Sequence, residues 1–337
     1  MNTKHFIQAW STSLGLLTWL VFCSLQPTVL AQALDVPKPP VPDGYRLVEG
    51  DIQVPIDPTF GLVTPAAVFP PDPGLLSERD YWPNGEVFYE FDDNVNQANR
   101  QAMLQAMAVW EGVARLTFKP KGSLDFYYLH IQNSTENSSP VGRQRITFKS
   151  TISIRSWDLR YVMVHELGHT LGLWHEQSRS DRNSYIRINS ANILPGREID
   201  FEVRNEALHY GPYDFDSVMH YDQFASSANG LPTITVLPPY DVQWQNRIGQ
   251  LTHLSYWDSL VISLLYPQPD WRFVDQAADN DFCRGGTFFD PYKYFFCGTV
   301  NVPSGGTVWI QPGRYPGHVT YTKRMTWKAP LGGVTIY

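Results

Sequence analysis

Three histidines at fixed spacing restrict the fold of this chain more than any other feature. His165 and His169 stand four residues apart, so on a helix they project from one face toward the same point. Gly172 follows three residues after His169, and His175 three residues after that. Glycine adopts the positive φ that ends a helix and turns the chain back. The spacing therefore predicts that a helix and the turn after it bring three imidazoles together.

This set of side chains is typical of a catalytic zinc site. Three neutral imidazoles leave a fourth position open, whereas structural zinc is usually closed by four protein ligands. Glu166 lies beside His165 and on a helix points close to the same ion without ligating it, which suits a general base. The alternative, two surface histidines on an amphipathic helix, does not account for the third histidine. We expect one Zn²⁺ held by His165, His169 and His175, with Glu166 accepting the proton.

A second segment, residues 217–221, fits the same site. Met219 lies 54 residues after His165, in a short apolar run that ends at Tyr221. In metzincin peptidases a tight turn with a buried methionine forms the floor beneath the three histidines. Alone, such a methionine would be ordinary core packing. Combined with the long histidine motif, it indicates that both segments build one site.

These motifs resemble those of the astacin family. In residues 165–182 a glutamate, Glu176, follows the third histidine, and an Arg-x-Asp-Arg sequence comes next, as in the astacin signature. Residues 217–221 are similar to the astacin form of the methionine turn, and the resemblance extends from about Trp82 to Tyr266. It implies an α+β fold, a metzincin-type zinc protease domain with two lobes, a mixed sheet and an active-site helix.

The resemblance also implies roles for single residues. Tyr221 would be a displaceable zinc ligand that swings toward the substrate and stabilises the oxyanion. Glu176 would bind the buried N-terminus of the mature enzyme. Many astacin-like domains carry two disulfides, but this chain has no cysteine between Trp82 and Tyr266, so packing must replace them.

Residues 48–51 are similar to the pro-segment motif Phe-x-Gly-Asp of the same family, with Val48 in place of the aromatic residue. In that motif the aspartate occupies the open zinc position of the zymogen. Two interpretations stay open at this point: Asp51 is an aspartate switch that ligates the metal, or Gly50 and Asp51 form an ordinary turn.

The N-terminus predicts export. An apolar run, residues 14–25, follows Lys4, and residues 31–33 have the small-residue spacing that a signal peptidase requires. The run is shorter than the roughly 20 residues that span a bilayer, which disfavours a membrane anchor. We expect a signal peptide over 1–33, a proline-rich pro-segment over 34–75 and a secreted protein, extracellular or periplasmic.

The catalytic domain is expected over 76–268. Strands are predicted over 86–91, 116–119, 126–132 and 151–154. Apolar positions at three- and four-residue spacing predict a helix over 96–114, and a further helix is expected over 255–265. The histidine helix is predicted over 158–173, with Asp158 as its N-cap and Gly172 as its stop.

The C-terminal segment, residues 269–337, is expected to be small and β-rich. From Gly305 onward its short strands and glycines resemble a β-solenoid, although a generic β-rich appendage is an equal alternative. One or two coils cannot bury a core alone, so this segment should pack on the protease domain or contact a partner or matrix. Cys283 and Cys297 are expected to form a disulfide if the protein is exported.

Charge and composition exclude some classes of function. The net charge of -7 comes from 26 basic and 33 acidic residues without a long run of one sign, so nucleic acid is not an expected partner. No later segment is apolar enough to span a membrane. Protein or peptide substrates are the expected partners. Two other classes are a catalytically silent relative and a matrix- or glycan-binding protein that uses the aromatic residues of its tail.

Overall fold

The computed structural model describes residues 45–55, 81–144, 148–205, 207, 209–279, 283–317 and 320–337. All of them belong to one compact unit, Pro39–Tyr337. The predicted signal peptide, the start of the pro-segment and residues 56–80 lie outside the described residues. None of the described helices is long and apolar enough to cross a membrane.

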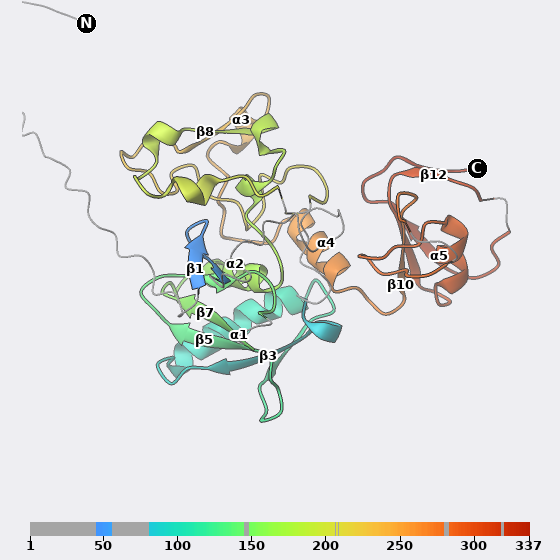
Figure 1. Ribbon diagram of the computed structural model, residues 1–337, viewed down its shortest axis with the longest axis horizontal. Coiled ribbons are helices and arrows are strands. Elements are labelled where there is room, and N and C mark those ends of the chain that lie inside the picture. Colours follow the sequence, from blue (N-terminus) through green and yellow to red (C-terminus); the bar gives the residue numbers. More distant parts are fainter. Residues whose placement is uncertain are drawn as a thin grey trace, which may run out of the picture. The chain divides into compact units, whose positions relative to one another are not determined.

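The largest sheet among the described residues has four parallel strands and lies in the lower part of the protease domain in Figure 1. Its spatial order is β4-β3-β5-β7, and its buried side chains include Val87, Leu129, Ile131 and Ile152. Antiparallel pairing enters at the β7 edge, where Ser138 bridges Ser153. The strands are β3 (Glu86–Phe91), β4 (Thr117–Pro120), β5 (Tyr128–Asn133) and β7 (Lys149–Ile154). The strand predicted over 126–132 therefore begins two residues later, and the Phe126 side chain is exposed.

Helices α1 (Gln97–Glu111) and α2 (Arg160–Thr170) pack against each other beside this sheet (Figure 1). The α1 face predicted from the spacing is buried at Met103, Met107 and Trp110, because these positions recur every three or four residues. Trp110 also donates its indole N–H to the Val164 carbonyl of α2 at 3.0 Å. The sheet and both helices thus share one core, which fixes the position of α2.

The ends of α2 differ in part from the prediction. Its N-cap is Leu159, which makes no capping hydrogen bond through its side chain, so the prediction of Asp158 as N-cap was wrong. The helix stops at Thr170, and Gly172 follows with φ 114°, the positive φ that the turn requires. From Met163 to Thr170 every residue of α2 is buried, so packing on all sides outweighs a weak cap.

Residues 176–254 consist mainly of short elements around a separate core. The antiparallel strands β8 (Ile186–Ile188) and β9 (Ile234–Val236) pair here, and α3 (Asp241–Trp244) follows. The described part of this region also has four 3-10 turns: η3 (Glu176–Ser178), η4 (Arg182–Ser184), η5 (Ser190–Asn192) and η6 (Glu198–Phe201). Another, η2 (Pro83–Gly85), precedes β3. Aromatic residues dominate this second core, among them Phe201, Tyr213 and Phe215.

Helix α4 (Tyr256–Leu265) joins two cores. Ser255 and Asp258 form a capping box at its start, which explains why the predicted helix begins there. Ile262 and Leu265 pack in the main protease core, whereas Leu260 and Leu264 pack against Phe273 of the C-terminal segment. The helix therefore has two apolar faces, each covered by a different part of the chain.

The C-terminal segment contains two sets of parallel strands. In one set β10 (Trp271–Val274), β11 (Thr307–Ile310) and β13 (Thr326–Lys328) pair, and in the other β12 (Gly313–Tyr315) pairs with β14 (Val334–Ile336). Helix α5 (Phe295–Asn301) packs on the first set. Cys283 and Cys297 form a disulfide, as predicted.

A hairpin from the predicted pro-segment extends the edge of the protease sheet. Its strands β1 (Tyr45–Val48) and β2 (Ile52–Pro55) are antiparallel, and β2 pairs in parallel with β6 (Ser139–Pro140). Because the adjoining Ser138 bridges β7, the hairpin lies on the β7 side of the sheet. Its loop, residues 49–51, reaches the histidines of α2.

Candidate active site

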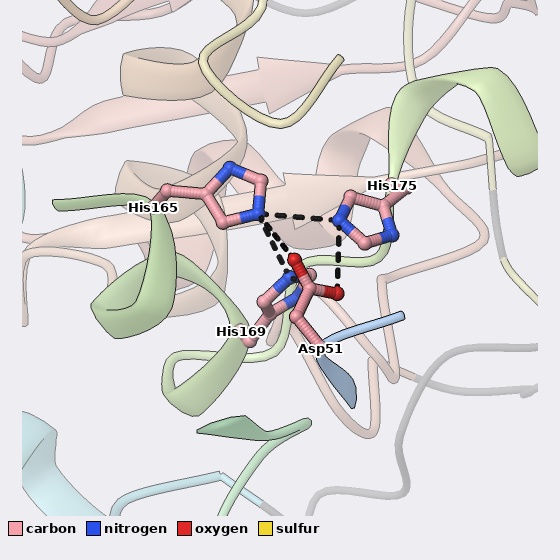
Figure 2. Close-up of side chains that lie close together, drawn as sticks. All are labelled: Asp51, His165, His169 and His175. Carbon is pink, nitrogen blue, oxygen red and sulfur yellow. Dashed lines mark hydrogen bonds and ion pairs between the residues drawn. The ribbon is translucent and has the colours of Figure 1, made fainter. Parts of the chain in front are cut away.

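The three predicted histidines converge on one point (Figure 2). The Nε2 atom of His165 lies 3.1 Å from that of His169 and 3.2 Å from that of His175. Each Nδ1 atom faces outward to a different oxygen: His165 donates to the Val218 carbonyl and His169 to the Leu173 carbonyl, both at 2.8 Å. These bonds fix the ring orientations and leave the Nε2 lone pairs directed inward, as in zinc sites.

Asp51 closes the same cluster from the hairpin loop. Its carboxylate oxygens lie 3.4 Å from Nε2 of His165 and of His175 and 3.9 Å from that of His169. All four candidate ligand atoms lie within 4.8 Å of one another. Burial alone would raise the pKa of Asp51, but the adjacent imidazoles of His175, His165 and His169 outweigh it and lower the pKa.

The donor set fits one zinc ion. Zinc–nitrogen bonds of about 2.0–2.1 Å at tetrahedral angles place the nitrogens about 3.3 Å apart, close to the separations found here. Oδ1 of Asp51 is buried and has no hydrogen-bond partner among the described residues, which is costly unless a cation lies beside it. Three imidazoles and one carboxylate therefore match a four-coordinate zinc site.

Glu166 is buried beside this cluster on the same helix. Its side chain is 1% exposed, and Oε2 has no hydrogen-bond partner among the described residues. Burial raises the pKa of Glu166 well above its ordinary value, and the negative charge of Asp51 raises it further. A carboxyl with a raised pKa is a stronger proton acceptor once it is ionised, which suits a general base.

The methionine turn lies beneath the histidines. Met219 is buried, and a Cβ atom added at Gly168 would lie 2.7 Å from its sulfur, so only glycine lets the helix approach this turn so closely. Asp258 holds the turn from α4 by accepting the Ser217 hydroxyl at 2.7 Å and the Val218 N–H at 2.9 Å. The second motif is thus placed where the sequence predicted.

Tyr221 lies at the edge of the site with its hydroxyl turned to the hairpin. Its ring centroid is 4.5 Å from that of His175, and its hydroxyl donates to the Glu49 carbonyl. Burial, followed by the charges of Asp51 and Asp200, raises the pKa of Tyr221 well above its ordinary value. The structure places the phenol within reach of the histidines, and its roles as zinc ligand and oxyanion donor stay predictions.

Glu176 lines a cavity of about 90 Å³ together with Met219 and Phe288. It accepts hydrogen bonds from Arg179 at 3.1 Å and from the Asp214 N–H at 2.7 Å. Burial raises the pKa of Glu176 to about 8, although Arg179 and the Asp214 N–H act against it. Its predicted role, binding a mature N-terminus, is not tested by these contacts.

Three residues that the sequence reasoning did not single out belong to the site. Glu49 adjoins the Gly-Asp pair of the hairpin loop, Arg204 reaches it from 155 residues away, and Asp258 supports the methionine turn. A capping-box pattern, Ser255 followed by an acid three residues later, could have drawn attention to Asp258. No local signal predicts the contact between Glu49 and Arg204.

The fold and the site define a zinc metallopeptidase domain. The model of the peptidase family described as Astacin matches residues 75–267, more than half of the 337 residues. The chain therefore belongs to the astacin family. Its zinc cofactor and its hydrolase class follow from this membership and from the three histidines.

Known relatives agree with this assignment. Bone morphogenetic protein 1 of Xenopus laevis is 37% identical over 210 residues, which are 61% of this chain and 29% of that protein. Astacin-like metalloprotease toxin 1 of Loxosceles intermedia is 29% identical over 262 residues, 76% of this chain and 93% of the toxin. The chain spans only 29% and 37% of the length of two of its relatives, bone morphogenetic protein 1 and zinc metalloproteinase nas-14 of Caenorhabditis elegans.

A solved structure shares the fold. High choriolytic enzyme 1, a hatching enzyme zinc-protease from Oryzias latipes, superposes with a TM-score of 0.52 at 30% identity. The match covers 57% of this chain and 96% of that enzyme. The similarity therefore includes nearly the whole chain of that zinc-protease.

Proposed function

We propose that this protein is a secreted zinc-dependent endopeptidase that hydrolyses peptide bonds of protein substrates and is made as a zymogen. The observation that carries the proposal is the convergence of three Nε2 atoms beside the buried carboxyl group of Glu166. A catalytically silent relative would not need a buried carboxyl at this position, since it is costly to maintain.

In the proposed mechanism His165, His169 and His175 hold the metal. Zinc, when bound there, supplies a Lewis acid that lowers the pKa of water and polarises the scissile carbonyl. Glu166 accepts a proton of the attacking water at its free Oε2 atom and delivers it to the nitrogen of the leaving amine. Tyr221 donates its hydroxyl to the developing oxyanion once the hairpin has left.

The substrate is proposed to bind as an added strand at the edge that the hairpin now covers. The Ser139 N–H donates to the Asp51 carbonyl at 2.9 Å, so this edge offers backbone groups to an extended peptide. Because β2 already occupies these groups, an extended peptide cannot pair with them before the hairpin leaves. The same hairpin places Asp51 at the histidines, where it acts as the aspartate switch of the zymogen.

The proposed chain organisation follows the sequence. Residues 1–33 are a signal peptide, 34–75 a pro-segment, 76–268 the catalytic domain and 269–337 the C-terminal segment. Two separate apolar cores support a two-lobed catalytic domain. The parallel strands of the C-terminal segment support a solenoid-like form. Its exposed aromatic residues Tyr294, Phe296 and Trp327 offer a surface for a matrix or partner, whereas Trp309 and Tyr315 are buried.

Processing N-terminal to Tyr81 is proposed to create a new amino group that binds at Glu176. Glu176, Asp214 and Asp258 line the cavity there together with Arg179, and an added amino group would favour the charged form of these acids. Removal of the hairpin would free the metal position that Asp51 covers. Binding of the new N-terminus at Glu176 would complete the mature form.

Hydrolysis of casein tests the proposal. The chain cut N-terminal to Tyr81 should cleave casein, whereas Glu166→Gln should lower kcat at least about 1,000-fold because the proton acceptor is lost. Chelated protein should be inactive until Zn²⁺ is restored. The exposed acid Glu202 gives a matched control, Glu202→Gln, which should cleave like the native chain. If the cut, zinc-loaded chain is inert, the proposal is wrong and a binding role becomes the better one.

A further inference from the structure

The loop of the pro-hairpin carries a second buried carboxylate, Glu49. None of its surface is exposed, and it is held by three donors. Its Oε2 atom accepts the His175 Nδ1–H at 2.9 Å and the Ser178 hydroxyl at 2.8 Å. Its Oε1 atom accepts the Nε–H of Arg204. A buried carboxylate is stable only with such partners, and hydrogen bonds between charged groups are among the stronger ones.

The backbone at Glu49 adopts a costly conformation. Its φ is 51°, in the left-handed region that residues with a Cβ atom rarely adopt. Such a conformation persists only when its surroundings hold it in place. The Tyr221 hydroxyl donates to the Glu49 carbonyl, so both the backbone and the side chain of this residue are bound. Residues outside the loop therefore form a defined binding site for Glu49.

The two acids of the loop use different partners. Asp51 faces the three Nε2 atoms, where the metal belongs, at 3.4–3.9 Å, and its Oδ1 atom has no hydrogen-bond partner among the described residues. Glu49 instead binds the outer nitrogen of His175 and two residues, Ser178 and Arg204, that are not candidate ligands. Without the metal the contacts of Asp51 are long, whereas Glu49 has hydrogen bonds to three protein groups.

We propose that Ser178, Arg204 and the Nδ1–H of His175 form a carboxylate-binding site that holds the pro-hairpin through Glu49 without the metal. The unprocessed chain then has two anchors. Asp51 covers the catalytic position, whereas Glu49 keeps the hairpin docked before zinc is loaded and after it is lost. The role given to the hairpin rests on the proposed zymogen function. The carboxylate-binding site itself does not depend on catalytic activity.

One consequence concerns the third histidine. His165 and His169 are oriented by carbonyls of the protease domain itself, but His175 is oriented by a carboxylate of the segment proposed to be removed. Such outer partners fix the tautomer and orientation of a ligating histidine. The Glu49 carboxylate thus also orients the His175 ring for metal binding while the chain is unprocessed.

Hydrogen exchange in the unprocessed, metal-free protein tests the proposal. We expect the amides of residues 52–54 to stay protected after chelation. Glu49→Gln should speed their exchange at least about tenfold, because it weakens buried hydrogen bonds to a charged group. Asp51→Asn should change the metal-free rate by less than about threefold, because its contacts to the histidines are 3.4 Å or longer without the ion. Ser178→Ala, which removes one donor, should give an intermediate rate.

A matched control is Glu202→Gln, which neutralises an exposed acid near Arg204 and should leave exchange unchanged. The proposal is overturned if chelation alone releases the hairpin of the native chain, or if Glu49→Gln exchanges like the control. If Glu49→Gln fails to fold, Ser178→Ala decides, because a rate equal to that of the native chain would refute the site. A chain without peptidase activity would contradict the proposed function and leave this inference intact.

Discussion

Replacing Asp258 by alanine should loosen the methionine turn and the start of α4 together. The carboxylate accepts the Ser217 hydroxyl at 2.7 Å and the N–H groups of Val218 and Ser255, both at 2.9 Å. The side chain is 6% exposed, so water cannot easily replace it. The Val218 carbonyl in turn orients His165, which connects this one acid to the metal centre.

The magnitude follows from the donors left without an acceptor. Each buried backbone N–H that loses its partner costs about 1–3 kcal/mol, and two are lost along with a hydroxyl contact. Asp258→Ala should therefore lower the free energy of unfolding by about 3–5 kcal/mol. Asp258→Asn keeps one oxygen for the two N–H groups and should cost about 1–2 kcal/mol. Zinc affinity should fall about 10- to 100-fold in the alanine variant, as when outer partners of ligands are lost.

Urea unfolding of the metal-free protein measures the first effect, and competition with a chromophoric chelator measures the second. Asp93, an exposed acid, gives the control variant Asp93→Ala, expected within about 0.5 kcal/mol of the native chain. An Asp258→Ala cost below about 1 kcal/mol, or equal costs for alanine and asparagine, would refute the reasoning. Unchanged zinc affinity in a destabilised variant would refute the link to His165.

Three further perturbations have definite expected results. Gly168→Ala should destabilise the protein by about 1–3 kcal/mol in thermal unfolding, because the new Cβ would lie 2.7 Å from the Met219 sulfur; an unchanged melting temperature would contradict this close packing. Burial raises the pKa of Asp214 from 3.8 to about 6, so its contribution to stability is present below pH 3.8 and lost as pH rises through about 6. The free energy of unfolding of Asp214→Asn should therefore fall less between pH 3.8 and about 6 than that of the native chain. An equal fall in both proteins would contradict this prediction. Reducing the disulfide between Cys283 and Cys297, which are 14 residues apart, should destabilise the C-terminal segment by about 3 kcal/mol, seen as faster proteolysis there; equal cleavage rates would argue against it.

The sequence predicts the histidine cluster well because its geometry is local. Two residues four apart on a helix share a face, and a glycine that adopts positive φ returns the chain, so His165, His169 and His175 need no long-range information. The same holds for α1, whose apolar face repeats with the helical period. Predicting the position of Met219 required only its typical separation from the histidines and its apolar surroundings in the sequence.

Other parts of the site depend on contacts that no local pattern encodes. Glu49 and Arg204 are 155 residues apart and meet because the hairpin pairs with β6, a strand of two residues. The sequence left two interpretations of Asp51 open, and the structure places its carboxylate 3.4 Å from two of the histidine nitrogens. The prediction of Asp158 as N-cap was wrong for a related reason, since tertiary burial of α2 decides where that helix begins.

Helix α4 has a consequence for how proteins of this kind can be rearranged. A protease domain that is joined to its neighbour by a free linker can be cut out and fused elsewhere. Here Leu260 and Leu264 are 8% and 0% exposed and pack with Phe273 and Trp309 from beyond the proposed domain boundary. Cutting the chain at Gln268 would expose this apolar interface to solvent on the helix that supports the methionine turn. In domain shuffling, therefore, the catalytic domain and its tail would have to move as a single exchangeable module.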